Sequence, residues 1–255
     1  MSLLKIGIVE SIRNDLKQVV GVAILASGDF RRNLESALSG LLTAFALTVL
    51  LYFLLQSKIA FLLVASGYMI AGSFNAGGTA AQRVIITWRL TKVLDVMMVS
   101  KLKRWNFVLG SALAACTFGF ASDFFYILVI SIIAGKPEIV LLAFVFAPLM
   151  SLLGTLIGMN IASRVKSYLK AYSIYGMIFF ILFFIPPVFY PVANMPEALR
   201  PLVFLTPTGL GAETLRMIAG ISEPVYPLWL LAGALAVWLL ASVILFSKTI
   251  KWDLD

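Results

Sequence analysis

The sequence predicts an all-α membrane protein in which six transmembrane helices form one bundle. Of the 255 residues, 61% are hydrophobic and 13% are charged, whereas soluble domains average about half and about a quarter. The mean hydropathy of +1.01 agrees with this excess. Six apolar stretches also follow one another, each near the roughly 20 residues that a helix needs to cross a bilayer. We therefore treat residues 1–255 as a single transmembrane domain.

The six predicted spans occupy residues 37–55, 59–80, 107–134, 139–162, 171–185 and 226–246. The fifth is short because Pro186 and Pro187 end its apolar run. Proline lacks the backbone donor that continues a helix and clashes with the preceding turn. On the fourth span, Gly154 and Gly158 form a G-x-x-x-G pattern, which lets helices approach closely.

The N-terminal segment, residues 1–36, predicts a helix lying in the cytoplasmic interface. Ile8, Ile12, Leu16 and Val19 fall at helical spacing, with charged residues elsewhere on the wheel. A signal peptide is the alternative, with residues 19–26 as its apolar core. Its leading region would be long and mixed in charge, which is unusual for such a peptide.

Charge placement predicts which side each loop faces. Sixteen of the 20 basic residues lie before the first span, in the loop 82–105, after the fourth span or after the last span. The other side carries the remaining four, Lys58, Lys136, Arg200 and Arg216. Because basic loops stay in the cytoplasm, both termini are predicted to be cytoplasmic. The net charge of +8 then reflects topology, and no nucleic-acid partner is expected.

Residues 186–224 predict a broken hairpin that dips back into the membrane from the outer side. The stretch contains Pro186, Pro187, Pro191, Pro196, Pro201 and Pro207, yet apolar side chains fill most positions between them. Irregular backbone at membrane depth is tolerated only inside protein or beside a water-filled cavity. Glu213 and Arg216 can meet on one helical face. If buried, this pair would hold the second half of the hairpin together; if exposed, it would contribute little.

The cytoplasmic loop 82–105 is too long for a simple turn, and it predicts a short amphipathic helix that a soluble partner could bind. The residues at helical spacing are Leu90, Val93, Leu94, Met97, Met98 and Lys101. The alternative is a helix lying flat on the lipid surface.

Four sequence features in the hairpin resemble the permease subunit of type-2 ABC exporters. They are the PPVFYP run from Pro186, the Met195-Pro196-Glu197 turn, the Thr206-Pro207-Thr208 run and the Glu213-x-x-Arg216 pair. The resemblance implies an outer gate formed by Pro186, Pro187, Phe189, Tyr190, Pro191, Pro207, Glu213 and Arg216. It also implies that residues 90–101 form the coupling helix that docks on an ATPase. Here Ser100 and Lys101 stand where the family would have Thr-Pro, and the Gly-Thr that usually precedes this helix is missing.

The resemblance further implies a homodimer in the plasma or inner membrane of a prokaryote, with two copies of a separate ABC ATPase. This chain would bind no cofactor, since ATP and Mg²⁺ would sit on the ATPase. Such a permease exports a drug-, lipid- or glycan-like substrate. The scarcity of charge along the spans favours an amphipathic one.

No enzymatic activity is expected of this chain. It has no histidine, one cysteine (Cys116) and no phosphate-binding loop, so metal, triad and nucleotide sites are not predicted. The alternative function is a secondary transporter or channel with a broken-helix site. An intramembrane enzyme is the third class, and it would need convergent polar groups. Asp123 is the one acidic residue well inside a predicted span. We expect it near the outer boundary, either solvated or paired with Lys136 or Arg200, although a functional intramembrane carboxylate remains an alternative.

Overall fold

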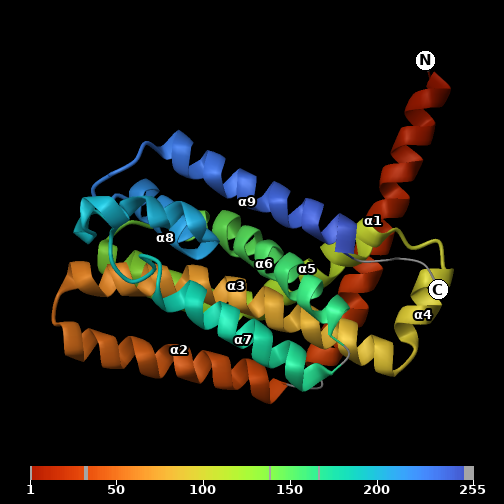
Figure 1. The fold of residues 1–255 in the computed structure, drawn as a ribbon, viewed down its shortest axis with the longest axis horizontal. Coiled ribbons are helices and arrows are strands. Elements are labelled where there is room, and N and C mark those ends of the chain that lie inside the picture. The colour runs from red at the N-terminus through yellow and green to blue at the C-terminus, as the bar shows by residue number, and fades with distance from the viewer. Residues whose placement is uncertain (1, 32–33, 138, 166, 250–255) are drawn as a thin grey trace.

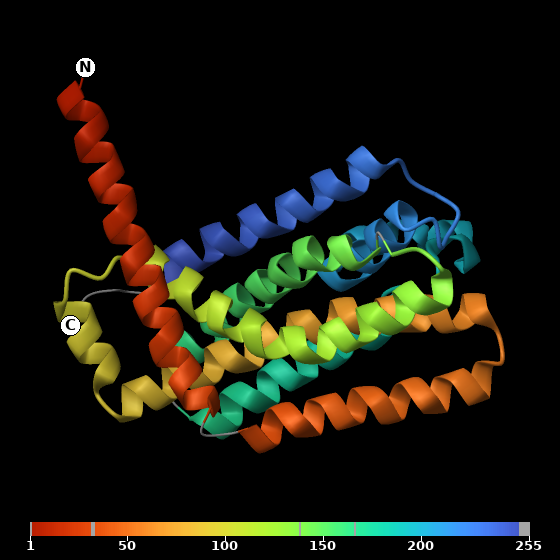
Figure 2. The same cartoon turned by 180° about the vertical axis from the view of Figure 1, so that it is seen from behind.

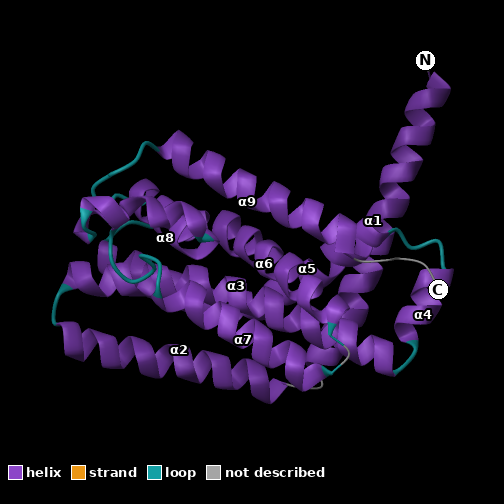
Figure 3. Cartoon of the chain, in the orientation of Figure 1, coloured by secondary structure: helices purple, strands orange, loops and turns teal. Residues whose placement is uncertain are grey.

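The fold is that of a computed structural model, which describes residues 2–31, 34–137, 139–165 and 167–249. Every regular element in these ranges is a helix (Figure 3). The α-helices are α1 Ser2–Arg31, α2 Leu34–Leu55, α3 Lys58–Leu90, α4 Val93–Val99, α5 Arg104–Ala134, α6 Ile139–Arg164, α7 Tyr168–Phe184, α8 Pro207–Ile218 and α9 Leu228–Thr249. Two 3-10 helices, η1 Val192–Asn194 and η2 Glu197–Leu205, precede α8. The all-α class is thus confirmed for the described part of the chain.

Each predicted span coincides with one long helix: α2, α3, α5, α6, α7 or α9. Among the described residues, α3, α6 and α9 are long and apolar enough to cross a membrane. The other three helices contain shorter apolar stretches, Phe45–Leu55, Asp123–Ala134 and Leu169–Phe184. The chain therefore has the apolar helices of a membrane protein, and six crossings stay a prediction.

Two predicted boundaries differ from the structure. The loop expected from residue 82 is helical as far as Leu90, so α3 is one helix of 33 residues. The sequence 82–90 contains no glycine or proline, and Val84, Ile85 and Trp88 are buried, so nothing stops the helix there. It ends where Lys92 adopts a left-handed conformation with φ of 62°. The predicted N-terminal segment 1–36 also differs, because α1 ends at Arg31 and α2 already begins at Leu34.

The helices form an elongated bundle with two different ends (Figures 1 and 2). One end, here called the hairpin end, carries the α2–α3 turn, η1, η2 and α8. The opposite end, here called the α4 end, carries α4 and the oblique helix α1. Three basic residues counted as cytoplasmic, Arg32, Lys166 and Lys251, lie outside the described residues.

Helices α3 and α6 touch backbone to backbone at the centre of the bundle. A Cβ atom added to Gly77 would lie 2.0 Å from the Ser151 carbonyl oxygen, and one on Gly154 would lie 1.9 Å from that of Phe74. A Cβ on Gly158 would approach the Gly78 carbonyl oxygen to 2.4 Å. No other residue type fits these positions without moving a helix. The predicted packing role of Gly154 and Gly158 is therefore confirmed.

Two apolar clusters fill the bundle, one toward each end. The cluster nearer the hairpin end includes Phe61, Phe74, Tyr126 and Met150. The cluster nearer the α4 end joins Val22 of α1, Trp88 of α3, Leu94 of α4, Phe107 of α5 and Phe246 of α9. The second cluster fixes α1 and α4 to the bundle.

Candidate functional site

The break after α7 follows directly from Pro186 and Pro187. A proline at 186 cannot donate the hydrogen bond that the Leu182 carbonyl would receive in a continuing helix. The Thr208 hydroxyl donates to that carbonyl instead, at 2.5 Å. Thr208 lies in the first turn of α8, where Pro207 occupies a position that needs no backbone donor. The chain thus leaves α7 and returns to it, as the predicted hairpin requires.

Arg216 lies at the centre of this hairpin, and its side chain is 0% exposed. Its Nη1 donates to the carbonyls of Pro187 and Tyr190, both at 3.1 Å. Its Nη2 donates to the carbonyl of Leu63 at 2.7 Å and to that of Val188. Its Nε donates to the Ser66 hydroxyl at 2.9 Å. One guanidinium therefore joins α8, the proline segment and α3.

Glu213 completes the same cluster from the preceding turn of α8. Its Oε2 lies 3.8 Å from Nη1 of Arg216 and accepts the backbone N–H of Val192 at 3.4 Å. The side chain is 2% exposed, so the buried alternative for the Glu213–Arg216 pair is the one observed. The pair holds more than the second half of the hairpin, since its partners lie in residues 187–192 and in α3.

Gly67 explains how the proline segment comes so close to α3. A Cβ atom at this position would lie 1.8 Å from the Val188 carbonyl oxygen and 3.0 Å from Nη2 of Arg216. Any side chain would push the segment away and break the carbonyl contacts of Arg216. Ser66, Gly67 and Thr208 were missed by sequence reasoning, because each is paired with residues far away in the chain.

The two aromatic residues predicted for the gate, Phe189 and Tyr190, lie in the same proline segment as this cluster. Phe189 packs edge-on against Phe183, with ring centroids 4.7 Å apart. Tyr190 is 37% exposed and its hydroxyl donates to the Ile185 carbonyl at 3.3 Å. Pro191 precedes η1. Of the eight residues predicted for the gate, Arg216 thus contacts Pro187, Tyr190 and Glu213 directly, whereas Phe189 packs on α7.

Two more contacts hold the hairpin to the bundle. The Lys136 ammonium donates to the Ala219 carbonyl at 2.8 Å and so caps the C-terminus of α8, where a positive charge is favourable. The Trp238 indole of α9 donates to the Phe204 carbonyl at 3.0 Å. Arg200 stays within its own loop, donating to the carbonyls of Met195 and Ala193.

The expectation for Asp123 is wrong. Its side chain is buried, with 5% exposed, and its Oδ2 accepts a hydrogen bond from the Ser73 hydroxyl at 2.6 Å. Lys136 and Arg200, the expected partners, bind carbonyls elsewhere. The partner of this carboxyl is therefore a hydroxyl of helix α3 within the bundle. In the part of the chain that the structure describes, no group of three His, Cys, Asp or Glu side chains could hold a metal.

The residues predicted for docking do not all share one exposed face of α4. Leu94 is buried, and Met97 and Met98 pack beside it on the cluster at the α4 end. Leu90, Val96 and Val99 are 74%, 70% and 73% exposed, and Val93 is 37% exposed. Lys101 lies in the loop after the helix. The predicted helix is present, but Leu94, Met97 and Met98 face the chain's own core. We call Val93, Val96 and Val99 of α4, together with Leu90 at the end of α3, the open α4 face.

A hydrogen-bonded cluster ties α1 to the loop after α4. The Asp15 carboxylate receives hydrogen bonds from the Lys103 ammonium at 2.8 Å and the Asn106 amide at 2.9 Å. Gln18 accepts from the Lys103 backbone N–H at 3.2 Å and donates to the Lys101 carbonyl at 3.0 Å. The bonds from Lys103 and Asn106 hold the pKa of the Asp15 carboxyl below its ordinary value of 3.8. The sequence carried no motif for this cluster.

Comparison with known families gives one match. The family model described as ABC-2 type transporter matches residues 22–219. The matched region contains α2 to α8, and with them the open α4 face and the whole Arg216 cluster. A search of curated proteins found no match.

Proposed function

Because the chain belongs to the ABC-2 type transporter family, we propose that it is the permease subunit of an ATP-driven exporter. A separate ABC ATPase would hydrolyse ATP and carry the Mg²⁺, while this membrane component would form the path. The substrate would be a drug-, lipid- or glycan-like amphipath leaving the cell. The scarcity of charged side chains along the long helices supports an amphipathic substrate over a strongly charged one.

The proposed topology is six spans with both termini in the cytoplasm of a prokaryotic cell. The bounds of α3, α5 and α9 place Arg89, Lys103 and Lys248 toward the α4 end, which supports a cytoplasmic position for it. The hairpin end would then face outward. Two copies of the chain would pair, and the substrate would pass between them along α2, α3 and α7, with the hairpins closing the outer end.

The single observation that carries this proposal is the contrast between the two ends. At one end a buried guanidinium holds a broken hairpin together; at the other a short helix carries apolar side chains that none of the described residues covers. Exposed apolar residues on a short, well-anchored helix are suited to a partner's groove. The open α4 face would therefore dock on the ATPase, in place of the stripe of Leu94, Met97 and Met98.

The test is Val96→Asp in the complex with its ATPase. A charge on a 70% exposed side chain should leave the membrane fold intact and remove ATPase co-purification and ATP-driven export. Thr91→Asp adds the same charge to an exposed polar position nearby and should change neither. Leu94→Asp would be uninformative because it would disrupt the chain's own core.

Co-purification and export that survive Val96→Asp would reject docking through this face. Export driven by an ion gradient, without any ATPase, would instead favour the secondary-transporter class. ATP-driven and ion-driven export are both measured in proteoliposomes, and co-purification is measured in detergent. The elution profile of the variant in size-exclusion chromatography checks that it folds.

A further inference from the structure

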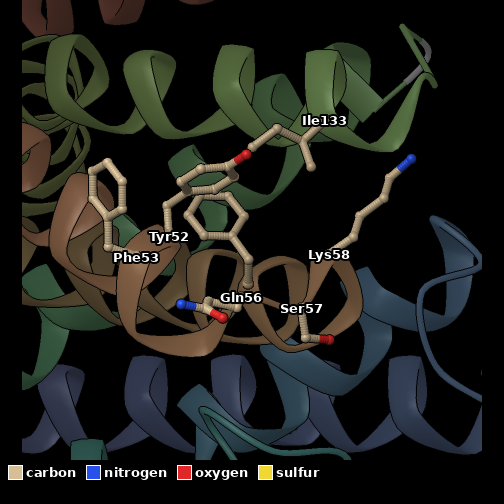
Figure 4. Close-up of a pocket in the computed structure, with 7 residues that line it drawn as sticks. Tyr52, Phe53, Gln56, Ser57, Lys58 and Ile133 are labelled. Atoms are coloured by element: carbon tan, nitrogen blue, oxygen red, sulfur yellow. The ribbon is translucent and has the colours of Figure 1, made fainter.

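A cavity of about 460 Å³ opens at the hairpin end, between the α2–α3 turn and the last turn of α5 (Figure 4). Its volume lies within the roughly 300–1,000 Å³ typical of small-molecule sites. It is lined by Tyr52, Phe53, Gln56, Ser57, Lys58, Phe61 and Ile133. The predicted hairpin gate does not include this cavity, and nothing in the ATPase coupling uses it.

The wall of the cavity is aromatic, and the buried ring of Phe61 supports it. Phe61 is 2% exposed, and Tyr52 meets it edge-on with ring centroids 6.1 Å apart. Tyr52 and Phe53 are 58% and 70% exposed, so their outer surfaces are free to contact a ligand. Figure 4 shows both rings on the same side of the turn as Ile133.

Lys58 supplies a positive charge at the rim. Three of the four basic residues at the hairpin end are engaged, because Lys136, Arg200 and Arg216 each bind backbone carbonyls. Among the residues that the structure describes, the Lys58 ammonium has no hydrogen bond or ion pair, and its side chain extends away from the turn in Figure 4. A cation beside an apolar wall is complementary to an anionic amphipath.

The apolar surface continues from the cavity toward the middle of the bundle. On α2, Phe45, Val49 and Phe53 follow one another at helical spacing and are all exposed. Phe45 contacts Phe125 of α5, with ring centroids 5.8 Å apart, so α2 and α5 form a seam that leads away from the cavity. A soluble anion would contact only Lys58 at the rim, whereas a ligand with a long apolar chain would also bind along the α2–α5 seam.

We propose that this cavity binds an anionic phospholipid of the outer leaflet. The phosphate would pair with the Lys58 ammonium, the glycerol region would lie against Tyr52 and Phe53, and one acyl chain would follow the α2–α5 seam. Aromatic rings and lysine side chains are both favoured at the level of lipid headgroups. The inference rests on the proposed function only for the identity of the leaflet, since the lipid contacts proposed here do not require transport.

The test uses the full chain in nanodiscs of phosphatidylcholine that contain a photoactivatable phosphatidylglycerol. Cross-linked peptides should map to residues 52–61 and to the segment around Ile133. Lys58→Gln should lower the yield about fivefold, the effect of one lysine next to an anionic headgroup, and Lys58→Arg should restore it. Phe53→Ala should also lower the yield. The matched control is Leu54→Ala, because Leu54 is 68% exposed but does not line the cavity.

Competition distinguishes the ligands. Excess phosphatidylglycerol should displace the label, while phosphatidylcholine and inorganic phosphate should not. Equal displacement by phosphatidylcholine, or unchanged labelling in Lys58→Gln, would overturn the proposal, and displacement by inorganic phosphate would reassign the cavity to free anions. In liposomes, a label added from outside should reach the site; labelling only from the lumen would overturn the outer-leaflet assignment. No arm requires the ATPase, so failure of the transport proposal would be seen separately.

Discussion

Arg216 is the residue on which the hairpin end depends most directly. A buried charge is costly unless hydrogen bonds replace its hydration, and here the guanidinium reaches the carbonyls of Leu63, Pro187 and Tyr190. These carbonyls lie in two different segments, so a planar group with five donors suits them better than a single ammonium. The positive charge is balanced only in part by Glu213, at 3.8 Å.

Arg216→Lys should therefore destabilise the protein although the charge is kept. The ammonium offers three donors and cannot span both segments, so about 3 kcal/mol of stability should be lost, in the range for charge-assisted buried hydrogen bonds. Thermal unfolding in detergent measures this loss. The control is Arg200→Lys at the same end, whose ion-pair partner Glu197 is 89% exposed, and it should cost less than about 1 kcal/mol. Equal losses for the two variants would contradict the special role of Arg216.

The Asp15 cluster predicts how acid affects the contact between α1 and the loop after α4. The folded-state pKa of Asp15 is lowered by Lys103 and Asn106, so the contact is stabilising above the ordinary pKa of 3.8 and is lost as the pH falls through the still lower folded value. Pulsed EPR between spin labels at Ser11 and Ser100, in a Cys116→Ser background, should give one distance at pH 7 and at about pH 4.5.

Asp15→Asn removes the charge that Lys103 binds, and its EPR distance distribution should be broad already at pH 7. The neighbouring change Asn14→Asp, on the same helix, should leave the distance unchanged. A wild-type distance in Asp15→Asn would show that apolar contacts of Val22 alone hold α1 in place.

At this scale the sequence singled out the residues of the Arg216 cluster in the hairpin but not their partners in α3. Pro186 and Pro187 could be singled out because prolines in an apolar run are unusual, and Arg216 because the Glu-x-x-Arg pair is part of the family resemblance. Ser66, Gly67 and Thr208 could not, because a serine, glycine or threonine in a membrane helix is common. Their importance arises from contacts with residues 26 to 150 positions away.

Among the elements, the proline segment between α7 and α8 determines the shape of the hairpin. Without a donor at residue 186, the last turn of α7 is completed by the Thr208 hydroxyl, so the helix end and the helix that follows are built as one unit. The segment then passes over Gly67, where Val188 meets α3. The hairpin is thus held in part by a hydrogen bond to the Leu182 carbonyl, which is available because Pro186 has no N–H to donate to it.

Pro186→Ala together with Pro187→Ala should let α7 extend outward. Each change recovers roughly 3 kcal/mol of helical preference, and an amide at 186 would compete with Thr208 for the Leu182 carbonyl. Phe189 and Tyr190 would leave the closure, so passive leak should rise or export fall while ATP hydrolysis persists. Proteoliposomes containing the ATPase measure all three quantities.

The control for the double change is Pro148→Ala, which replaces a proline inside α6, away from the hairpin. It should leave the leak at the wild-type level. Wild-type leak and export in the double variant would mean that residues 186–191 are an ordinary loop and not a gate.

For the helices, the sequence predicted positions better than boundaries and exposed faces. Long apolar stretches gave the positions of the six long helices, because burial in lipid requires length and apolarity that few other sequences have. The boundary between α3 and α4 was missed, since it depends on Lys92 adopting a left-handed conformation. Docking through α4 stays a prediction, and the sequence did not show that Leu94 is buried whereas Leu90 and Val93 are exposed, because helical spacing identifies an apolar face without saying whether the chain itself covers it.

For the whole molecule, the expected functions separate along the bundle axis. The Arg216 cluster and the cavity beside Lys58 lie at the hairpin end, and the open α4 face and the Asp15 cluster lie at the α4 end (Figure 1). A substrate path between two copies would run between these ends. The predicted sidedness is therefore the property on which both proposals depend most.

Single cysteines in a Cys116→Ser background test the sidedness. A membrane-impermeant maleimide added to sealed cells should label positions 58, 137 and 194, at the hairpin end. Position 100, at the α4 end, should react only after permeabilisation. Labelling of position 100 in sealed cells would reverse the topology, whereas the family assignment would be unaffected.

The unbroken helix α3 connects the hairpin end to the α4 end, so a movement at one end can be passed to the other. Its 33 residues make a rod about 50 Å long, pressed against α6 at Gly77. If α3 pivoted at this point, its two arms would be unequal, about 29 Å toward Lys58 and about 20 Å toward Leu90. If the rod tilts without bending, a push of about 2 Å beside α4 becomes a swing of about 3 Å, in the opposite direction, at the α2–α3 turn. Leu63 and Ser66 lie on the long arm, so the lever would carry Arg216 and the hairpin with it.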